Sequence, residues 1–237
     1  FLKVELRNIQ KLRQKEIGLK LSVTIKIKYK KYWRKTSLKQ KGVGNFFLKH
    51  IEKIKPKNFL EIGIFHGVTS RNVCDLLNSI HGDDFKFTGI DLFLTESEIS
   101  KDEHSPKIKF SNPLKTLYYK YIVRLDPYSM ESVEKLLKKY KKNINIIKGD
   151  SNKVLKEINL DNFEYVFLDG GHKYETVLND LKSLTKVIEN NGVILCDDYD
   201  LTYAPGVKKA IDEFIILNNF NLRVLNSRFA EITKDST

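Results

Sequence analysis

From residue 58 onward, short apolar runs alternate with longer amphipathic stretches, and this alternation is the feature that most restricts the fold. It is typical of βα units wound around a parallel sheet. Each run is bounded by Gly, Asp or Asn, as expected for buried strands that end at turns. We therefore predict an α/β, doubly wound and mostly parallel sheet, with strands at 58–63, 86–91, 144–148, 164–169 and 192–197.

The stretches between these strands predict helices, because their apolar residues recur at helical spacing. The last segment, FNLRVLNSRFAEIT at 220–233, instead predicts two strands around an Asn-Ser turn. An antiparallel hairpin of this kind fits the edge of a parallel sheet and brings the strand count to seven, in a Rossmann-like arrangement. The predicted helices lie at 46–54, about 68–80, 129–142, 150–158, 174–190 and 206–218.

Two parts of the chain interrupt the alternation. Residues 92–127 contain three prolines and an apolar series at helical spacing from Leu114 to Leu125, which predicts an inserted amphipathic helix in a lid or substrate wall. Residues 1–42 form a basic N-terminal extension, in which SVTIKIKYKKYW at 22–33 predicts a strand or an extended arm. We assign residues 43–237 to the main domain, with 92–127 inserted in it.

The net charge of +12 is concentrated at one end of the chain. Residues 1–57 hold 18 Lys and Arg against 3 Glu, a net +15, which leaves −3 for residues 58–237. Two cysteines, Cys74 and Cys196, both within apolar segments, do not make a disulfide framework, so we expect a reducing cytoplasm. No apolar run is long enough for a transmembrane segment. The chain begins with Phe1 rather than Met, so residues can be missing before it.

Polar groups stand at the ends of three successive predicted strands. The first runs into EIGIFHGVTS, where Glu61, Gly63 and Gly67 surround a turn into a helix. Glycines let a ligand approach the backbone, and the helix N-terminus offers free N–H groups. The second strand ends in Asp91, suited to the hydroxyls of a ribose, and the third in Asp150 and Ser151. Because the carboxyl ends of these three strands lie at one edge of the sheet, we predict a crevice there that binds a nucleotide-like ligand.

A second group of acids follows the next two strands. Asp169 ends VFLDGGHKY, and Asp197 and Asp198 end GVILCDDYD. If these strands are neighbours, their ends lie only ~5 Å apart. Three carboxylates that close repel one another unless a cation neutralises them, and oxygen ligands suit Mg²⁺, Ca²⁺ or Mn²⁺. We predict a divalent metal site, most simply for Mg²⁺, made by these three residues.

EIGIFHGVTS, GIDLF, IIKGDSNKVLKEI, VFLDGGHKYETVLNDL and GVILCDDYD, in this order, resemble the motifs of class I S-adenosylmethionine-dependent methyltransferases. The resemblance covers about residues 43–220. The D-G-G-H-x-Y, G-V-I-x-x-D-D-Y and P-G-V motifs are similar to those of the branch of metal-dependent O-methyltransferases that act on sugars of macrolides and related glycosides. The resemblance implies S-adenosylmethionine as cofactor. It also implies that Asp91 contacts the ribose of the cofactor and that Asp150 and Ser151 contact its adenine. The methionine part would be bound by Glu61, Gly63, Gly67 and Ser70.

His172 lies three residues after Asp169 on the same turn. Histidine, with a reference pKa of about 6.5, is the side chain best suited to accept a hydroxyl proton near neutral pH. The resemblance implies the same role, because sugar O-methyltransferases of this branch have a histidine base at this position. Asp169 and His172 are therefore the predicted catalytic pair of an enzyme that methylates a hydroxyl of a sugar, glycoside or small polyol.

Two other functions remain open for this fold and its basic N-terminus. One is an RNA- or ribosome-directed methyltransferase that docks through residues 1–57. Against it, the chain has no N/D-P-P-Y/F motif for amino groups of bases, and the acidic cluster would repel phosphate. The other is a contact with anionic lipid, or an oligomerisation strand, formed by residues 22–33. We expect a small-molecule or glycan substrate and a homo-oligomer.

Overall fold

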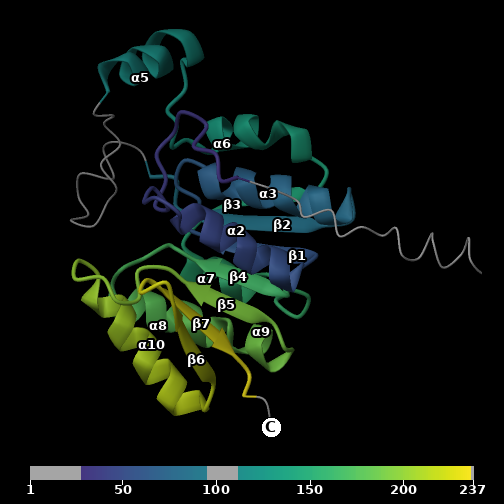
Figure 1. Ribbon diagram of the computed structural model, residues 1–237, viewed down its shortest axis with the longest axis vertical. Coiled ribbons are helices and arrows are strands. Elements are labelled where there is room, and N and C mark those ends of the chain that lie inside the picture. Colours follow the sequence, from purple (N-terminus) through teal and green to yellow (C-terminus); the bar gives the residue numbers. More distant parts are fainter. Residues whose placement is uncertain (1–27, 95–111, 236–237) are drawn as a thin grey trace, which may run out of the picture.

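A computed structural model describes residues 28–94 and 112–235 of the 237-residue chain. Seven strands form one sheet in the order β3-β2-β1-β4-β5-β7-β6 (Figure 1). The first five pair in parallel, and β7 pairs antiparallel with both β5 and β6. The strands are β1 (Asn58–Ile62), β2 (Lys86–Asp91), β3 (Ile144–Lys148), β4 (Tyr165–Leu168), β5 (Val193–Cys196), β6 (Asn221–Leu225) and β7 (Phe229–Thr233).

Helices cover both faces of the sheet (Figure 1). One face packs against α2 (Val43–Ile54), α3 (Val68–His81) and α6 (Met130–Leu137). The opposite face packs against α7 (Ser151–Glu157), α8 (Tyr174–Ser183), α9 (Thr185–Glu189) and α10 (Pro205–Asn218). The doubly wound seven-stranded fold predicted from the sequence is thus confirmed.

Alternation within the strands decides which side chains face which helical layer. In β4, Val166 and Leu168 face the layer of α8 and α10, whereas Tyr165 and Phe167 face the layer of α2 and α3. Both sets are buried, as expected for a central parallel strand covered on its two faces.

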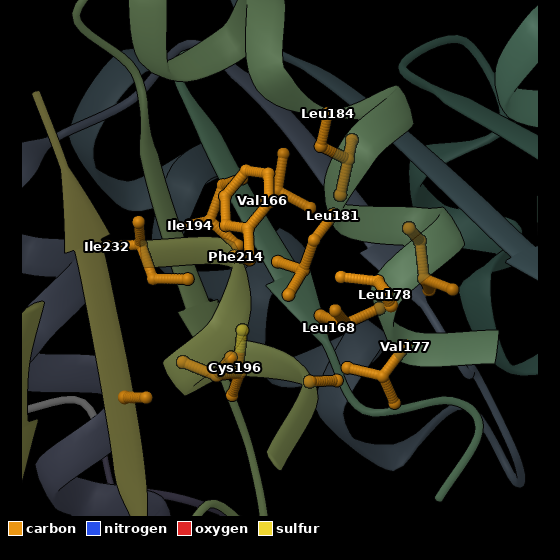
Figure 2. Close-up of a cluster of buried hydrophobic side chains, with 14 of the residues drawn as sticks. Val166, Leu168, Val177, Leu178, Leu181, Leu184, Ile194, Cys196, Phe214 and Ile232 are labelled. Carbon is orange, nitrogen blue, oxygen red and sulfur yellow. The ribbon is translucent and has the colours of Figure 1, made fainter. Parts of the chain in front are cut away.

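The core beneath α8 and α10 is continuous from the sheet to the helices. Figure 2 shows side chains from β4, β5, β7, α8 and α10 meeting there, with Phe214 of α10 among them. Phe214, Leu181 and Ile194 have no exposed surface. Burying each such side chain contributes about 1.5–3 kcal/mol, which fixes the helices that flank the ends of β4 and β5.

The five parallel strands lie within one residue of their predicted ranges, and the terminal hairpin turns at Asn226 and Ser227 as predicted. Two predicted helices are each divided. The helix at 129–142 tightens into a 3₁₀ turn at Lys138–Tyr140. The helix at 174–190 is interrupted at Leu184, whose backbone lies outside the helical region and separates α8 from α9.

The described part of the predicted insertion contains α5 (Pro113–Leu117), continued by a π-helical turn, Tyr118–Val123. The predicted helix is present, but its apolar stripe is not buried: Leu114, Leu117 and Ile122 are exposed, and Tyr119 is the buried residue. Figure 1 shows α5 standing away from the sheet, which explains the exposure. Residues 95–111 of the predicted lid lie outside the described residues.

Residues 28–42 precede α2 and form no strand. Of the two alternatives for residues 22–33, a strand or an extended arm, the strand is absent from the described part, residues 28–33; residues 22–27 lie outside the described residues. Arg34, Thr36 and Leu38 are buried against the domain. Among the helices of residues 28–94 and 112–235, none has both the length and the apolar character that crossing a membrane requires.

Candidate active site

Glu61 is the next-to-last residue of β1 and has no exposed surface. The Ser70 hydroxyl of α3 donates a hydrogen bond of 2.5 Å to its Oε2. Its Oε1 has no hydrogen-bond partner among the described residues. Burial raises the pKa of Glu61 to about 8, against an ordinary value of 4.5. A buried carboxyl oxygen without a hydrogen-bond partner destabilises the folded protein, so this oxygen suits a hydrogen-bond donor of a ligand.

Gly63 and Gly67 shape the turn that follows. Gly63 has φ of +94°, and a side chain there would overlap the backbone of Asp169 at the end of β4. Gly67 has φ of +69° and begins α3. The absence of a side chain at Gly63 therefore lets this turn approach the end of β4, and its absence at Gly67 lets α6 pack against the start of α3. His66, between them, is buried, and burial lowers its pKa to about 3, so the ring is neutral.

Asp91 lies at the end of β2, next to this turn. Its carboxylate accepts hydrogen bonds from the backbone N–H groups of Phe65 and Phe93, both at 2.8 Å, and from the Tyr128 hydroxyl at 2.9 Å. Burial raises its pKa. Protein donors thus already occupy most of the acceptor positions that the predicted ribose contact would use, and that contact stays a prediction.

Asp150 and Ser151 follow β3 at the start of α7. Asp150 caps the helix by accepting from the N–H of Asn152 at 3.1 Å. The Ser151 hydroxyl donates to Asp180 of α8 at 3.0 Å. Both side chains thus hold α7 in place at the edge of the crevice, and their contact with an adenine also stays a prediction.

The ends of β4 and β5 bring the predicted acidic cluster together. Asp169, Asp197 and Asp198 each offer a carboxylate oxygen, and these oxygens lie within 4.8 Å of one another. Together with His172 they line a cavity of about 10 Å³, close to the space of one water molecule or one metal ion. β4 and β5 are neighbours in the sheet, so the geometry expected from the sequence is present.

Arg228, a residue that the sequence did not single out, lies in the same cluster. Its guanidinium pairs with both oxygens of Asp197, through Nε to Oδ1 and through Nη2 to Oδ2 at 2.6 Å. Nη2 also lies 3.1 Å from Asp198 Oδ1. The sequence signal for this contact is the register of the hairpin against β5. Cys196 of β5 pairs with Ala230 of β7, so in an antiparallel pair Asp198, two residues after Cys196, lies opposite Arg228, two residues before Ala230.

The three carboxylates differ in their electrostatics. Burial, together with the charges of Asp197 and Asp198, raises the pKa of Asp169 well above its usual range. Burial also raises the pKa of Asp197, against the opposing effect of Arg228. For Asp198 burial is outweighed by hydrogen bonds from His172 and Tyr203 and by the charge of Arg228, so its pKa is lowered. Asp198 is therefore the carboxylate best stabilised as an anion.

His172 and Tyr203 complete the contacts of Asp198. His172 Nε2 lies 3.1 Å from Asp198 Oδ2, and the Tyr203 hydroxyl donates to Oδ1 at 2.7 Å. The two rings lie edge to face, with centroids 5.9 Å apart. The His172 side chain is 28% exposed and that of Asp198 only 5%, so the imidazole connects a buried anion to solvent.

The segment before α2 also contributes to the site. The Ser37 hydroxyl donates to Asp169 Oδ2 at 2.6 Å. Arg34 donates to the carbonyl oxygens of His66 and Pro127, both at 3.1 Å, and to the Ser132 carbonyl and hydroxyl oxygens, both at 2.9 Å. Residues 28–42 thus connect the β1 turn, α6 and the acidic cluster, which periodicity alone could not predict.

A methyltransferase-domain family model matches residues 60–199, more than half of the chain and all five parallel strand ends. The chain belongs to the methyltransferase-domain family. This membership confirms the resemblance to class I S-adenosylmethionine-dependent methyltransferases. A further match is an uncharacterised protein, R132, of Acanthamoeba polyphaga mimivirus, 28% identical over 109 residues, which are 40% of this chain and 49% of that protein. The match thus spans about half of that relative's length.

Solved methyltransferase structures share the fold. The O-methyltransferase NovP aligns at a TM-score of 0.59 and 17% identity over 82% of this chain and 81% of its own. The calicheamicin methyltransferase CalS11 aligns at 0.57 and 12%, over 81% and 78%. An S-adenosylhomocysteine-bound methyltransferase of Podospora anserina, PaMTH1, aligns at 0.53 and 16%, also over 81% and 78%. At such identities the likeness establishes the fold of this methyltransferase domain.

Proposed function

We propose that this protein transfers a methyl group from S-adenosylmethionine to a hydroxyl of a sugar, glycoside or small polyol. A divalent cation, most simply Mg²⁺, would activate the hydroxyl, and His172 would be the general base. The observation that carries the proposal is the meeting of three carboxylates and a histidine beside the β1 turn. NovP is an O-methyltransferase and CalS11 a TDP-rhamnose 3′-O-methyltransferase, which supports a hydroxyl acceptor.

The β1 turn fits the cofactor. When bound, S-adenosylmethionine supplies a methyl group on an electrophilic sulfonium. The unpartnered Oε1 of Glu61 suits the ammonium of its methionine part, with Ser70 holding the other oxygen. Gly63 and Gly67 let the turn pack closely against Asp169 and α6, which fixes the backbone beside which that part would lie. Asp91, Asp150 and Ser151 stay the proposed ribose and adenine contacts.

The acidic cluster fits a divalent cation by its charge and its ligand atoms. With all three carboxyl groups ionised, as a bound cation would keep them, the cluster and the guanidinium of Arg228 carry a net charge of −2. Oxygen ligands in a cavity of about 10 Å³ suit a hard ion, with Asp169, Asp197 and Asp198 as the proposed ligands. When bound, such an ion lowers the pKa of a coordinated hydroxyl.

His172 is held in one orientation by its partner. Because Nε2 donates to Asp198, a neutral ring has Nδ1 as its basic nitrogen. Asp198 then stabilises the imidazolium that forms when Nδ1 takes the acceptor proton, as a buried carboxylate does for a catalytic histidine. Asp169, bonded by Ser37, stays fixed on the other side of the cavity.

The acceptor would bind in the groove formed by the residues that follow Asp198 in the chain. Tyr199, Asp200, Lys208, Lys209 and Asp212 line a space of about 480 Å³ between the β5 end and the start of α10. Side chains of both charges together with a phenol ring suit a ligand with many hydroxyl groups. The volume lies in the range of small-molecule sites. Tyr203, exposed and bonded to Asp198, would contact the sugar ring.

The proposal is tested with labelled S-adenosylmethionine and a panel of nucleotide sugars, glycosides and polyols. Methylation should stop in EDTA and return with Mg²⁺. His172→Ala should lower kcat about 10²- to 10⁴-fold. The matched control is His81→Ala, a partly exposed histidine at the end of α3. Full activity in EDTA would contradict the metal, and a wild-type rate for His172→Ala would contradict the base.

An RNA-directed methyltransferase is the second candidate, favoured by one observation. In the segment before α2 the lysines at 28, 30, 31, 39 and 41 are exposed, next to the exposed ring of Trp33. Exposed cations with an aromatic ring suit a nucleic-acid backbone and its bases. RNA binding that weakens steeply with salt and disappears when these lysines become glutamines would favour this candidate over the sugar.

A further inference from the structure

Arg228 reaches the acidic cluster because of the turn that precedes it. Asn226 and Ser227 both have positive φ, 54° and 50°, and together with Arg228 they form the three-residue connection between β6 and β7. This geometry places Arg228 directly before β7, beside the end of β5, where the N–H of Tyr199 donates to its carbonyl at 2.9 Å. The side chain is buried, with 6% of the residue exposed.

The guanidinium takes up the acceptor capacity of one carboxylate. Both oxygens of Asp197 bind Arg228, and Oδ1 also accepts the N–H of Asp198 at 2.8 Å. Asp169 is different, because among the described residues it accepts one side-chain hydrogen bond, from the hydroxyl of Ser37. Arg228 meets only one oxygen of Asp198, Oδ1, at 3.1 Å, where the Tyr203 hydroxyl also donates, and Oδ2 faces His172; Asp198 and Asp169 both line the cavity.

We propose that Arg228 is a built-in cation of this cluster, which removes Asp197 from the ligand set and leaves Asp169 and Asp198 to hold the divalent ion. Arg228 is thus a positioning residue, and the inference rests on the metal of the proposed function. The guanidinium keeps the carboxylates together without an ion, because it neutralises one of their three charges. It also repels an incoming ion, so the ion binds weakly and exchanges readily.

Mn²⁺ binding tests this role. The electron paramagnetic resonance signal of the free ion measures how much Mn²⁺ is bound. Arg228→Met frees Asp197 and removes the repelling charge, so its affinity for Mn²⁺ should rise about tenfold or more. Its thermal midpoint should fall in EDTA and recover with Mn²⁺, whereas that of the wild type should change little. The matched control is Arg223→Met on the same hairpin, whose side chain is 55% exposed and pairs with Glu231.

A double variant separates charge from packing. Arg228→Met with Asp197→Asn restores the net charge of −2 and the two-carboxylate set, so its Mn²⁺ affinity should return to within about threefold of the wild type. If Arg228→Met does not fold, Arg228→Lys serves, because an ammonium cannot bind Asp197 through two parallel hydrogen bonds. A moderate rise in Mn²⁺ affinity is then expected.

The outcomes separate this inference from the proposed function. Arg228→Met that binds Mn²⁺ no more tightly than the wild type overturns the role of Arg228, whatever the wild type's activity. A wild type that neither binds Mn²⁺ nor loses activity in EDTA overturns the metal of the proposed function. In that case a Mn²⁺ site that emerges in Arg228→Met still supports Arg228 as the cation that keeps the cluster closed.

Discussion

Glu61→Gln should make the stability of the ligand-free protein less sensitive to pH. Glutamine has the shape of glutamate, can still accept the hydrogen bond from Ser70, and carries no charge. The pKa of Glu61 is raised by burial to about 8, and in the unfolded chain it is near 4.5. Between these values the folded state holds a proton that the unfolded state has lost, so the folded state loses stability as the pH rises.

The size of the effect follows from this difference in bound protons. One proton corresponds to about 1.4 kcal/mol per pH unit. Glu61 is fully buried, so solvent screening does not reduce the figure. From pH 5.5 to 7.5 the wild type should therefore lose about 2–3 kcal/mol relative to Glu61→Gln, within the window from about 4.5 to 8.

Urea unfolding of both proteins at several pH values measures this difference, with Glu134→Gln, an exposed carboxylate on α6, as the control. Parallel stability curves for the wild type and Glu61→Gln would refute the reasoning.

Cofactor binding gives an independent measurement of the proton on Glu61. An ammonium beside Glu61 should ionise it, so calorimetry of S-adenosylhomocysteine in two buffers near pH 7 should show the release of about one proton in the wild type and none in Glu61→Gln.

Three further variants test the packing around the site. Gly63→Ala should cost about 2 kcal/mol more than Gly82→Ala, since both have positive φ but only Gly63 faces the Asp169 backbone; urea unfolding measures both. Arg34→Met should lose about 3 kcal/mol and raise the KM for the cofactor, whereas exposed Arg124→Met should change neither. Phe214→Ala should lose about 3–5 kcal/mol and Ile216→Ala, 81% exposed, less than about 0.5 kcal/mol.

The strands and the acidic cluster could be predicted because both depend on local patterns. Short apolar runs bounded by Asp and Gly identify buried strands, and the parallel arrangement then places Asp169, Asp197 and Asp198 at one edge. The division of the helix at Leu184 was not visible, because the apolar spacing continues on both sides of it. The exposed stripe of α5 was missed because helical spacing does not say whether another element lies against it.

The partners of the acidic cluster could not be predicted, because they come from distant parts of the chain. Arg228 lies 31 residues from Asp197, and Ser37 lies 132 residues from Asp169. Their positions depend on strand register and on the path of a segment without regular structure, neither of which periodicity encodes. One sequence signal could have located Arg228. In the register that pairs Cys196 with Ala230, Arg228 lies opposite Asp198, and a search based on strand register would detect this pair of opposite charges.

The basic composition of the segment before α2 does not show which of its residues contact the site. Five of the six lysines at residues 28–42 are exposed and account for most of the segment's positive charge, whereas Arg34, Thr36 and Leu38 are buried. The residues that touch the site, Arg34 and Ser37, are thus distinct from those that make the segment basic. A role in methyl transfer and a role in binding an anionic partner can therefore be separated by substitution. Ser37→Ala perturbs the Asp169 carboxylate and leaves every lysine in place, and lysine-to-glutamine changes do the reverse.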